Sequence, residues 1–266
     1  MSEHTNSAPR SLARRPAFGA SAAALLRLSW VRTMTPVLVV AMLGLVLLPM
    51  AFGWLFVSRD IPDADPVAFL VKRYDELVCA LAMPLVALLL GTSAFSAEAE
   101  DGTLLYLVTT TTPRWWMSFV RVVFAAVGTA ILSAAAVMGT GLIVTGTSDP
   151  MHVTRAFTIA TRFGGATYAA LFTLLALITR RALVGGLAYV LFWEGILSTT
   201  FPGIHYLSVR QWSLSIANEL TASSAERLTN GPSPVASAIG AIIVVVLSVV
   251  IGGRALDRPR LSRVGT

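Results

Sequence analysis

Two sets of carboxylates are the side chains of this sequence best placed to do chemistry. Glu98, Glu100 and Asp101 lie close together just before Gly102. Acidic side chains in the first turn of a helix complement its exposed N–H groups, so this set predicts a short helix. Glu194 lies alone inside the apolar run YVLFWEGIL. An ionisable side chain in such a run is a candidate for proton or ion transfer, because an unpaired charge inside a membrane is costly.

The motifs of an ATPase or a metalloenzyme are absent from this sequence. A phosphate-binding loop, G-x-x-x-x-G-K-[ST], needs a lysine, and the sole lysine, Lys72, lies in no such string. The histidines do not form an H-E-x-x-H pair. Asp60, Asp63 and Asp65 lack the glycine turn and downstream acid of a calcium loop. We therefore expect no catalytic residue, no metal site, no cofactor in this chain, and no enzymatic activity of its own.

The composition indicates an integral membrane protein. Of the 266 residues 55% are hydrophobic and 13% are charged, whereas about 25% are charged in a typical soluble domain. The mean hydropathy is +0.74. The net charge of +6 does not indicate a nucleic-acid partner, because the basic residues are scattered at the ends of apolar runs. The expected partner is the lipid bilayer.

Six apolar runs approach the roughly 20 residues that span a bilayer. They are expected at residues 36–57, 77–95, 119–144, 157–178, 183–199 and 235–255. The predicted fold class is thus an all-α integral membrane protein with six transmembrane helices. This transmembrane domain covers residues 35–255, between a disordered tail at 1–17 and a short tail at 256–266.

The basic residues predict the orientation of the chain. Thirteen of the 20 lysines and arginines fall within residues 1–34, in or just after the 96–114 loop, at Arg180 and Arg181, and from Arg254 to the C-terminus. The other side receives seven. By the positive-inside rule, both termini and the 96–114 loop are expected in the cytoplasm, with the chain in the plasma membrane. The first outer loop is expected at 58–74, and Asp75 and Glu76 are also expected outside.

Two further segments are predicted to lie along the membrane surface. Residues 18–34 mix apolar side chains with Arg27 and Arg32, which is typical of an interfacial amphipathic helix, although an extension of the first span fits equally well. Residues 201–220 carry many apolar side chains, and the Pro202-Gly203 pair near their start breaks the chain just after the fifth run. They predict short helices that fold back into the outer membrane face. The alternative is a mobile outer loop.

The stretch 96–114, SAEAEDGTLLYLVTTTTPR, interrupts the second and third apolar runs. On a helical wheel its apolar side chains share one arc, whereas Gly102, Thr103 and Tyr106 share the other. Gly102 favours the close approach of another backbone. Pro113 ends the helix, because the residue before a proline avoids the helical conformation. One face is therefore expected to rest on protein or lipid while the other docks a partner.

The string EDGTL at 100–104, with Pro113 and Arg114 downstream and a long apolar run on either side, resembles the first cytoplasmic loop of ABC-2 type transporter permeases. In that family this loop contains a coupling helix that docks on the ATP-binding subunit. The resemblance covers about residues 18–255 and includes WEGILSTTFPG, which spans the end of the fifth run and the beginning of the outer segment. It implies a type V exporter-like fold with an interfacial helix, a coupling helix within 96–114 and an outer re-entrant segment at 199–234.

The resemblance also implies a function and partners. This chain would be the permease subunit of an ATP-driven exporter, an efflux system whose ATP and Mg²⁺ bind a separate nucleotide-binding subunit present in two copies. A second permease, identical or paralogous, would complete the dimer. The implied outer gate comprises Phe201, Pro202 and Gly203. The implied coupling residues are Glu98, Glu100, Asp101, Gly102, Thr103, Leu104 and Tyr106.

Glu194 leaves two interpretations open. It either stabilises the bundle near the outer interface, meeting water or an arginine such as Arg162, or acts as the relay of a proton- or ion-coupled secondary transporter. The sequence shows no second convincing intramembrane acid and no repeat between its halves, which disfavours the relay. A purely structural membrane scaffold is the third reading. The sequence does not identify the transported substrate.

Overall fold

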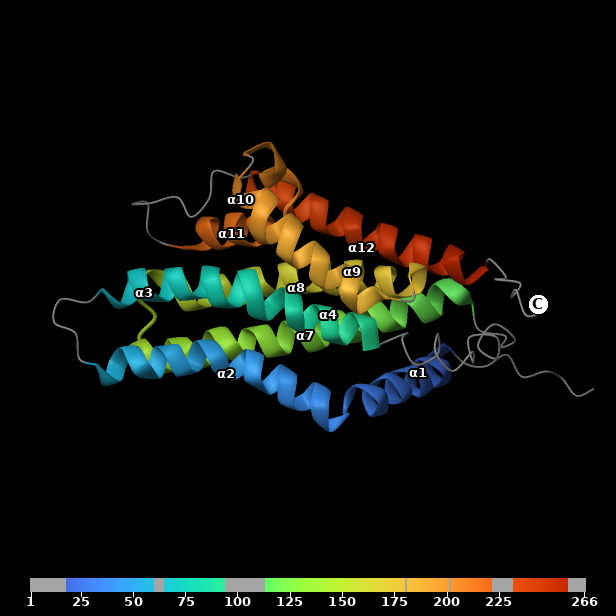
Figure 1. Ribbon diagram of the computed structural model, residues 1–266, viewed down its shortest axis with the longest axis horizontal. Helices are drawn as coiled ribbons and strands as arrows, with labels where there is room; N and C mark the ends of the chain where they lie inside the picture. Colours follow the sequence, from blue (N-terminus) through green and yellow to red (C-terminus); the bar gives the residue numbers. More distant parts are fainter. Residues whose placement is uncertain are drawn as a thin grey trace, which may run out of the picture.

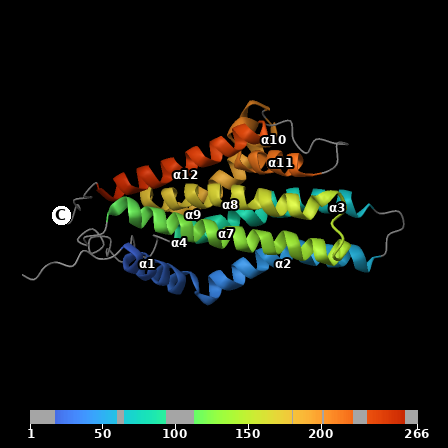
Figure 2. The same cartoon turned by 180° about the vertical axis from the view of Figure 1, so that it is seen from behind.

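The computed structural model describes residues 18–59, 65–93, 113–179, 181–200, 202–221 and 232–257. These residues form helices joined by short connections, and none of them lies in a strand. The helices run side by side along one long axis and form an elongated bundle (Figure 1). The view from behind shows the same arrangement (Figure 2).

Five helical segments in the described residues are long and apolar enough to cross a membrane. These segments indicate a multi-pass membrane protein. They are α2 (Pro36–Ser58), the continuous α3–η1–α4 (Pro66–Arg73, Tyr74–Ala82, Met83–Ser93), α7 (Arg114–Thr145), η2–α8 (Pro150–His152, Val153–Ile178) and α12 (Pro234–Asp257).

The run expected as the fifth of six spans forms a shorter, segmented helix. It comprises α9 (Ala182–Ala188), the π-helical stretch η3 (Tyr189–Leu197) and one further turn, α10 (Ser198–Thr200). Its apolar part, Ala182–Leu197, has 16 residues, fewer than the roughly 20 that span a bilayer. Helix length alone therefore gives five crossings, and the sixth stays a prediction.

The second long helix begins at Pro66 and not near residue 77, so the outer loop predicted at 58–74 was wrong over its second half. Asp65 is the N-cap, and its Oδ1 accepts the N–H of Val67 at 2.8 Å. Proline in the first turn is already fixed in a helical φ. The charged side chains that follow Pro66 lie on this helix, where Arg73 and Glu76 pair at 2.9 Å.

Helix α8 lies at the centre of the bundle. It packs against α4, α7, α11 and α12. Its buried aromatic side chains include Phe157, Tyr168 and Phe172. Close approach of α4 is possible because Gly91 faces the backbone of Phe172 and Thr173, where an added Cβ would lie 3.0 Å from the Thr173 nitrogen. α7 in turn packs against α1, α2, α4 and α12.

The N-terminal helix α1 (Phe18–Thr33) is separate from α2. The helical backbone is interrupted at Met34 and Thr35, and Pro36 starts α2. The two helices meet in an open V (Figure 1), with α1 packed against the beginning of α7. α1 is therefore not a straight extension of the first span. Its predicted position in the headgroup layer stays a prediction.

The segment after α10 folds back onto the bundle as two short helices, η4 (Pro202–Leu207) and α11 (Val209–Leu220). α11 packs against α8 and α12. Both helices lie toward one end of the bundle, near the start of α12 (Figures 1 and 2). The structure thus has short packed helices where the sequence predicted them, whereas their depth in a membrane stays a prediction.

Different segments of the chain lie at the two ends of the bundle. α1 and the C-terminal end of α12 lie at one end, and the 146–149 turn and the start of α3 lie at the opposite end (Figure 1). We call the latter the turn end. In the orientation predicted from the basic residues, the turn end faces outward.

Candidate functional site

The residues implied to couple the chain to an ATP-binding partner cannot be located. All of them lie outside the described residues, as does Phe201 of the implied outer gate. Pro202 and Gly203 form the beginning of η4. The functional residue that the structure does place is Glu194, so the candidate site is built around it.

Glu194 lies on η3 and is buried, with 2% of its surface exposed. Three donors reach its carboxylate. The hydroxyl of Ser208 donates to Oε2 at 2.5 Å, the backbone N–H of Val209 donates to Oε1 at 3.0 Å, and the hydroxyl of Tyr189 donates to Oε1 at 3.3 Å. Both carboxylate oxygens are therefore engaged, which offsets the cost of burying the group.

Two of these donors belong to the start of α11. Ser208 is the N-cap of that helix, and its Oγ also accepts the N–H of Gln211 at 3.2 Å. A carboxylate at this position satisfies N–H groups that have no partner within the helix and complements the positive end of the helix dipole. Glu194 thus fixes the first turn of α11 to η3.

Arg162, which the sequence suggested as a partner of Glu194, does not bind it. The acceptor atoms of Glu194 are used by the three donors above. Arg162 is exposed on α8 and lines a pocket between α7 and α8. The partner could not be inferred from sequence, because a backbone N–H such as that of Val209 leaves no signature in residue type.

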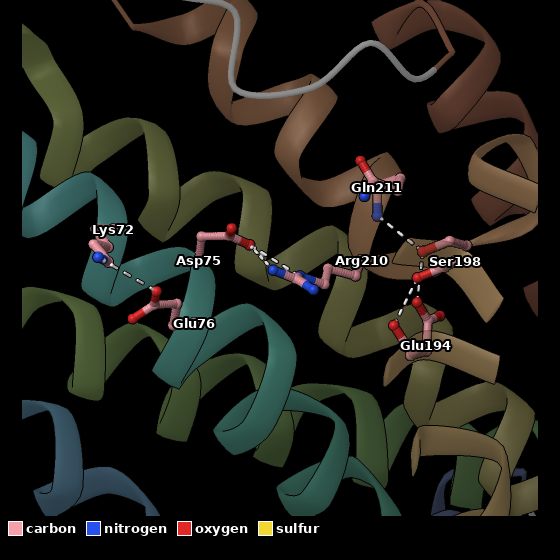
Figure 3. Close-up of polar contacts among 8 residues, drawn as sticks. Lys72, Asp75, Glu76, Glu194, Ser198, Arg210 and Gln211 are labelled. Carbon is pink, nitrogen blue, oxygen red and sulfur yellow. Dashed lines mark hydrogen bonds and ion pairs between the residues drawn. The ribbon is translucent and has the colours of Figure 1, made fainter. Parts of the chain in front are cut away.

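A second acid holds the same turn of α11. Oδ1 of Asp75 accepts from Nη2 of Arg210 at 2.7 Å and from Nε at 2.9 Å. Figure 3 shows these two side chains pointing toward each other between η1 and α11, with Glu194 of η3 on the other side of Arg210. The pair is largely withdrawn from solvent, since 31% of the Asp75 side chain and 15% of the Arg210 side chain are exposed. The sequence analysis missed this contact.

Both anchoring acids lie on π-helical stretches. In η1 the N–H of Met83 bonds the carbonyl of Val78, and in η3 the N–H of Ser198 bonds that of Trp193. These i to i+5 bonds widen the helix and change the direction of side chains relative to an α-helix. π-Helical turns are uncommon and occur frequently at functional sites. Here they coincide with the two positions that hold α11.

α11 also packs closely against glycines of α8 and α12. A Cβ at Gly164 of α8 would overlap Ser213 Oγ, so α11 rests directly on the α8 backbone there. The Trp212 indole donates to the carbonyl of Tyr206 at 3.0 Å. Its ring also lies 3.0 Å from where a Cβ at Gly240 of α12 would be. Small residues of this kind allow helices in membranes to pack closely.

The arrangement is suited to positioning a helix. Within the described ranges no group of three or more His, Cys, Asp or Glu side chains could hold a metal ion. The acids of the site instead bind one serine hydroxyl, one tyrosine hydroxyl, one backbone N–H and one arginine. What these contacts control is the position of α11 relative to η1 and η3.

Comparison of the sequence with protein-family models and with curated proteins finds no match. The resemblance to a transporter family therefore stays a prediction from the sequence.

Proposed function

We propose that this chain is the membrane-spanning permease subunit of an ATP-driven ABC-2 type transporter that works as an exporter. The observation that carries the proposal is the 96–114 stretch, with EDGTL at its centre, between two long apolar helices. The first is the continuous helix α3–η1–α4, which ends at Ser93. The second is α7, which begins at Arg114. The absence of a phosphate-binding loop in the sequence means that a separate subunit supplies ATP hydrolysis.

In this proposal α7 carries movement from the coupling loop across the bundle. α7 has 32 residues without interruption, and at 1.5 Å per residue it is about 48 Å long. It packs along α8, and α8 contacts α11. Docking of an ATP-binding subunit on Gly102 and its neighbours would therefore move α7, and the packed helices would carry this movement to α11 near the turn end.

The folded-back helices serve as the outer cap of the transport path. η4 and α11 lie toward the turn end, which the basic residues predict to face outward. Glu194 and the Asp75–Arg210 pair hold α11 in place. Irregular backbone within a membrane must be buried in protein or face water, and the packing of α11 on α8 and α12 meets that condition. Phe201, Pro202 and Gly203, at the beginning of this segment, form the proposed outer gate.

The proposed assembly contains two permeases, identical or paralogous, and two ATP-binding subunits in the plasma membrane. Both termini of the chain and the coupling loop face the cytoplasm. ATP and Mg²⁺ bind on the partner subunits. The chain itself performs no catalysis.

A proton- or ion-coupled secondary transporter is the second candidate function. The observation that favours it is the burial of Glu194 in an apolar helix. The three hydrogen bonds to its carboxylate weigh against it, because a relay must exchange protons and partners. We therefore assign Glu194 to anchoring α11.

Photo-cross-linking from the coupling loop tests the proposed function. A photoreactive amino acid at Thr103 should cross-link, in cells, to a polypeptide with an ATP-binding motif. The matched control places the same probe at Ser148, in the exposed turn at the opposite end of the bundle. An equal yield of the same product from Ser148, or no ATP-binding product from Thr103, would contradict the docking assignment.

A further inference from the structure

A pocket of about 490 Å³ opens between α7 and α8 at the turn end. Its lining is mostly apolar, with Met138 and Leu142 from α7 and Ile159 from α8. The polar part consists of hydroxyl groups, Asp149 and two arginines of α8, Arg155 and Arg162. A pocket that is apolar on one side and cationic on the other suits an amphiphile with an anionic group.

Arg162 is the unusual residue of this pocket. It is exposed, and it makes no hydrogen bond or ion pair with any residue in the described part of the chain. It follows Arg155 by seven positions on α8, which places it about 10 Å farther along the helix axis. The apolar neighbours Ile159 and Phe163 are 39% and 44% exposed, as expected of a surface that faces lipid.

The other charges of the pocket are already matched. Asp149 accepts the N–H of Thr154 at 2.9 Å and that of Arg155 at 3.1 Å. Its Oδ2 also lies 3.6 Å from Nε of Arg155. Asp149 and Arg155 therefore neutralise each other, and Arg162 leaves the pocket with one positive charge. An arginine within a span costs about 2.5–3.5 kcal/mol at the helix centre unless it finds a partner or reaches the interface.

We infer that this pocket binds a phospholipid with one net negative charge, of the phosphatidylglycerol type, in the leaflet at the turn end. The planar guanidinium of Arg162 forms paired hydrogen bonds with the phosphate. The first part of an acyl chain lies along Met138, Leu142 and Ile159. Basic pockets between membrane helices on the cytoplasmic side bind anionic lipid headgroups, and the same pairing of guanidinium and phosphate is available to Arg162 in the other leaflet. The inference requires only that α8 spans the membrane, and it does not depend on the transporter assignment.

The test uses the purified full-length protein in a neutral detergent, titrated with phosphatidylglycerol and followed by native mass spectrometry. Arg162→Gln should weaken binding about 10-fold, since a charge-assisted pair with phosphate is lost. The matched control is Arg59→Gln, which removes an exposed arginine at the end of α2 outside the pocket. Equal affinity of the wild type and Arg162→Gln would overturn the inference, as would an equal loss in Arg59→Gln.

Two further arms identify the source of the phosphate. Soluble glycerol phosphate should fail to displace the bound lipid, and phosphatidylcholine should bind more weakly than phosphatidylglycerol. Displacement by glycerol phosphate at the lipid's own concentration would show a site for free phosphate esters and overturn the lipid assignment. Equal binding of phosphatidylcholine would overturn the requirement for net negative charge.

A second variant keeps the test decisive if Arg162→Gln does not fold. Leu142→Trp fills the pocket at a position that is already 56% exposed, so the bundle tolerates it. It retains Arg162 and should still lower the affinity for phosphatidylglycerol. Wild-type affinity in Leu142→Trp would show that the lipid lies elsewhere.

Discussion

Asp75 and Arg210 lie 135 positions apart in the sequence, yet one carboxylate oxygen of Asp75 accepts hydrogen bonds from two nitrogens of Arg210, at 2.7 and 2.9 Å. The two residues preceding Arg210, Ser208 and Val209, bind Glu194. Three consecutive residues at the start of α11 are thus held by acids from two other helices. Polar contacts therefore help to position α11 in the bundle.

Removing one partner of the Asp75–Arg210 pair should destabilise the protein. We expect Asp75→Ala to cost about 1–3 kcal/mol, because it leaves the arginine largely buried without its acceptor. Arg210→Ala should cost a similar amount, and the double variant less than the sum of the two. Thermal unfolding in detergent measures all three. Strictly additive losses would show that the pair contributes no coupling.

Substitutions of Glu194 separate an anchor from a proton relay. Glu194→Gln keeps an acceptor for the N–H of Val209, so we expect near-wild-type stability and transport. Glu194→Ala leaves two donors at the start of α11 without their acceptor and should cost about 1–3 kcal/mol per group. Transport assays in inverted vesicles and thermal unfolding provide the readouts. Loss of transport in a stable Glu194→Gln protein would favour the relay.

Because Gly164 contacts α11, we expect a single methyl group added at position 164 to displace α11. Gly164→Ala should displace α11, because the added Cβ overlaps Ser213, and overpacking of this kind typically costs about 1–3 kcal/mol. Gly44→Ala is the matched control, since a Cβ at Gly44 meets nothing within 4 Å.

Thiol labelling detects that displacement. A cysteine in place of buried Ala217, in a Cys79→Ser background, should react slowly with a membrane-impermeant reagent. It should react faster when Gly164→Ala is added and at an unchanged rate with Gly44→Ala. The same slow rate in all three proteins would refute the close packing of α11 on α8.

Reporter fusions decide the number of crossings. Six crossings place fusions after Thr147 outside and fusions after Thr112 or at Thr266 in the cytoplasm. Five crossings, counted from long helices alone, would place Thr112 and Thr266 on opposite sides of the membrane. An external signal at Thr266 with a cytoplasmic signal at Thr112 would therefore contradict the crossing by 182–200.

The long helices were largely predictable because each depends on a local apolar run. The first span was expected at 36–57 and is observed at Pro36–Ser58. The start of the second was missed because the apolar run begins only near residue 77, after Lys72, Asp75 and Glu76. The Asp65-Pro66 capping signal was present in the sequence, but aspartate and proline also favour turns. On the helix Arg73 pairs with Glu76 three positions later. Asp75 pairs with Arg210, a distant partner that the sequence does not reveal.

The candidate site was predicted only in part. Glu194 could be identified because a lone acid in an apolar run is unusual. Its partners could not, since one is a backbone N–H and another is a serine 14 positions away. Asp75 and Arg210 meet only through the folding back of α11, and no local pattern encodes a contact of that range. The π-helical stretches that contain the two acids likewise depend on packing, and no sequence pattern indicates them.

ATP hydrolysis by the protein isolated from its own membrane tests the proposed function most directly. The tagged wild-type chain should co-purify with ATPase activity, although the pure chain alone hydrolyses no ATP. Gly102→Trp should reduce the co-purified activity to background while the amount of chain in the membrane stays the same, because a bulky side chain blocks close approach of the ATP-binding subunit. The same ATPase activity in both proteins, or none with the wild type, would contradict the account.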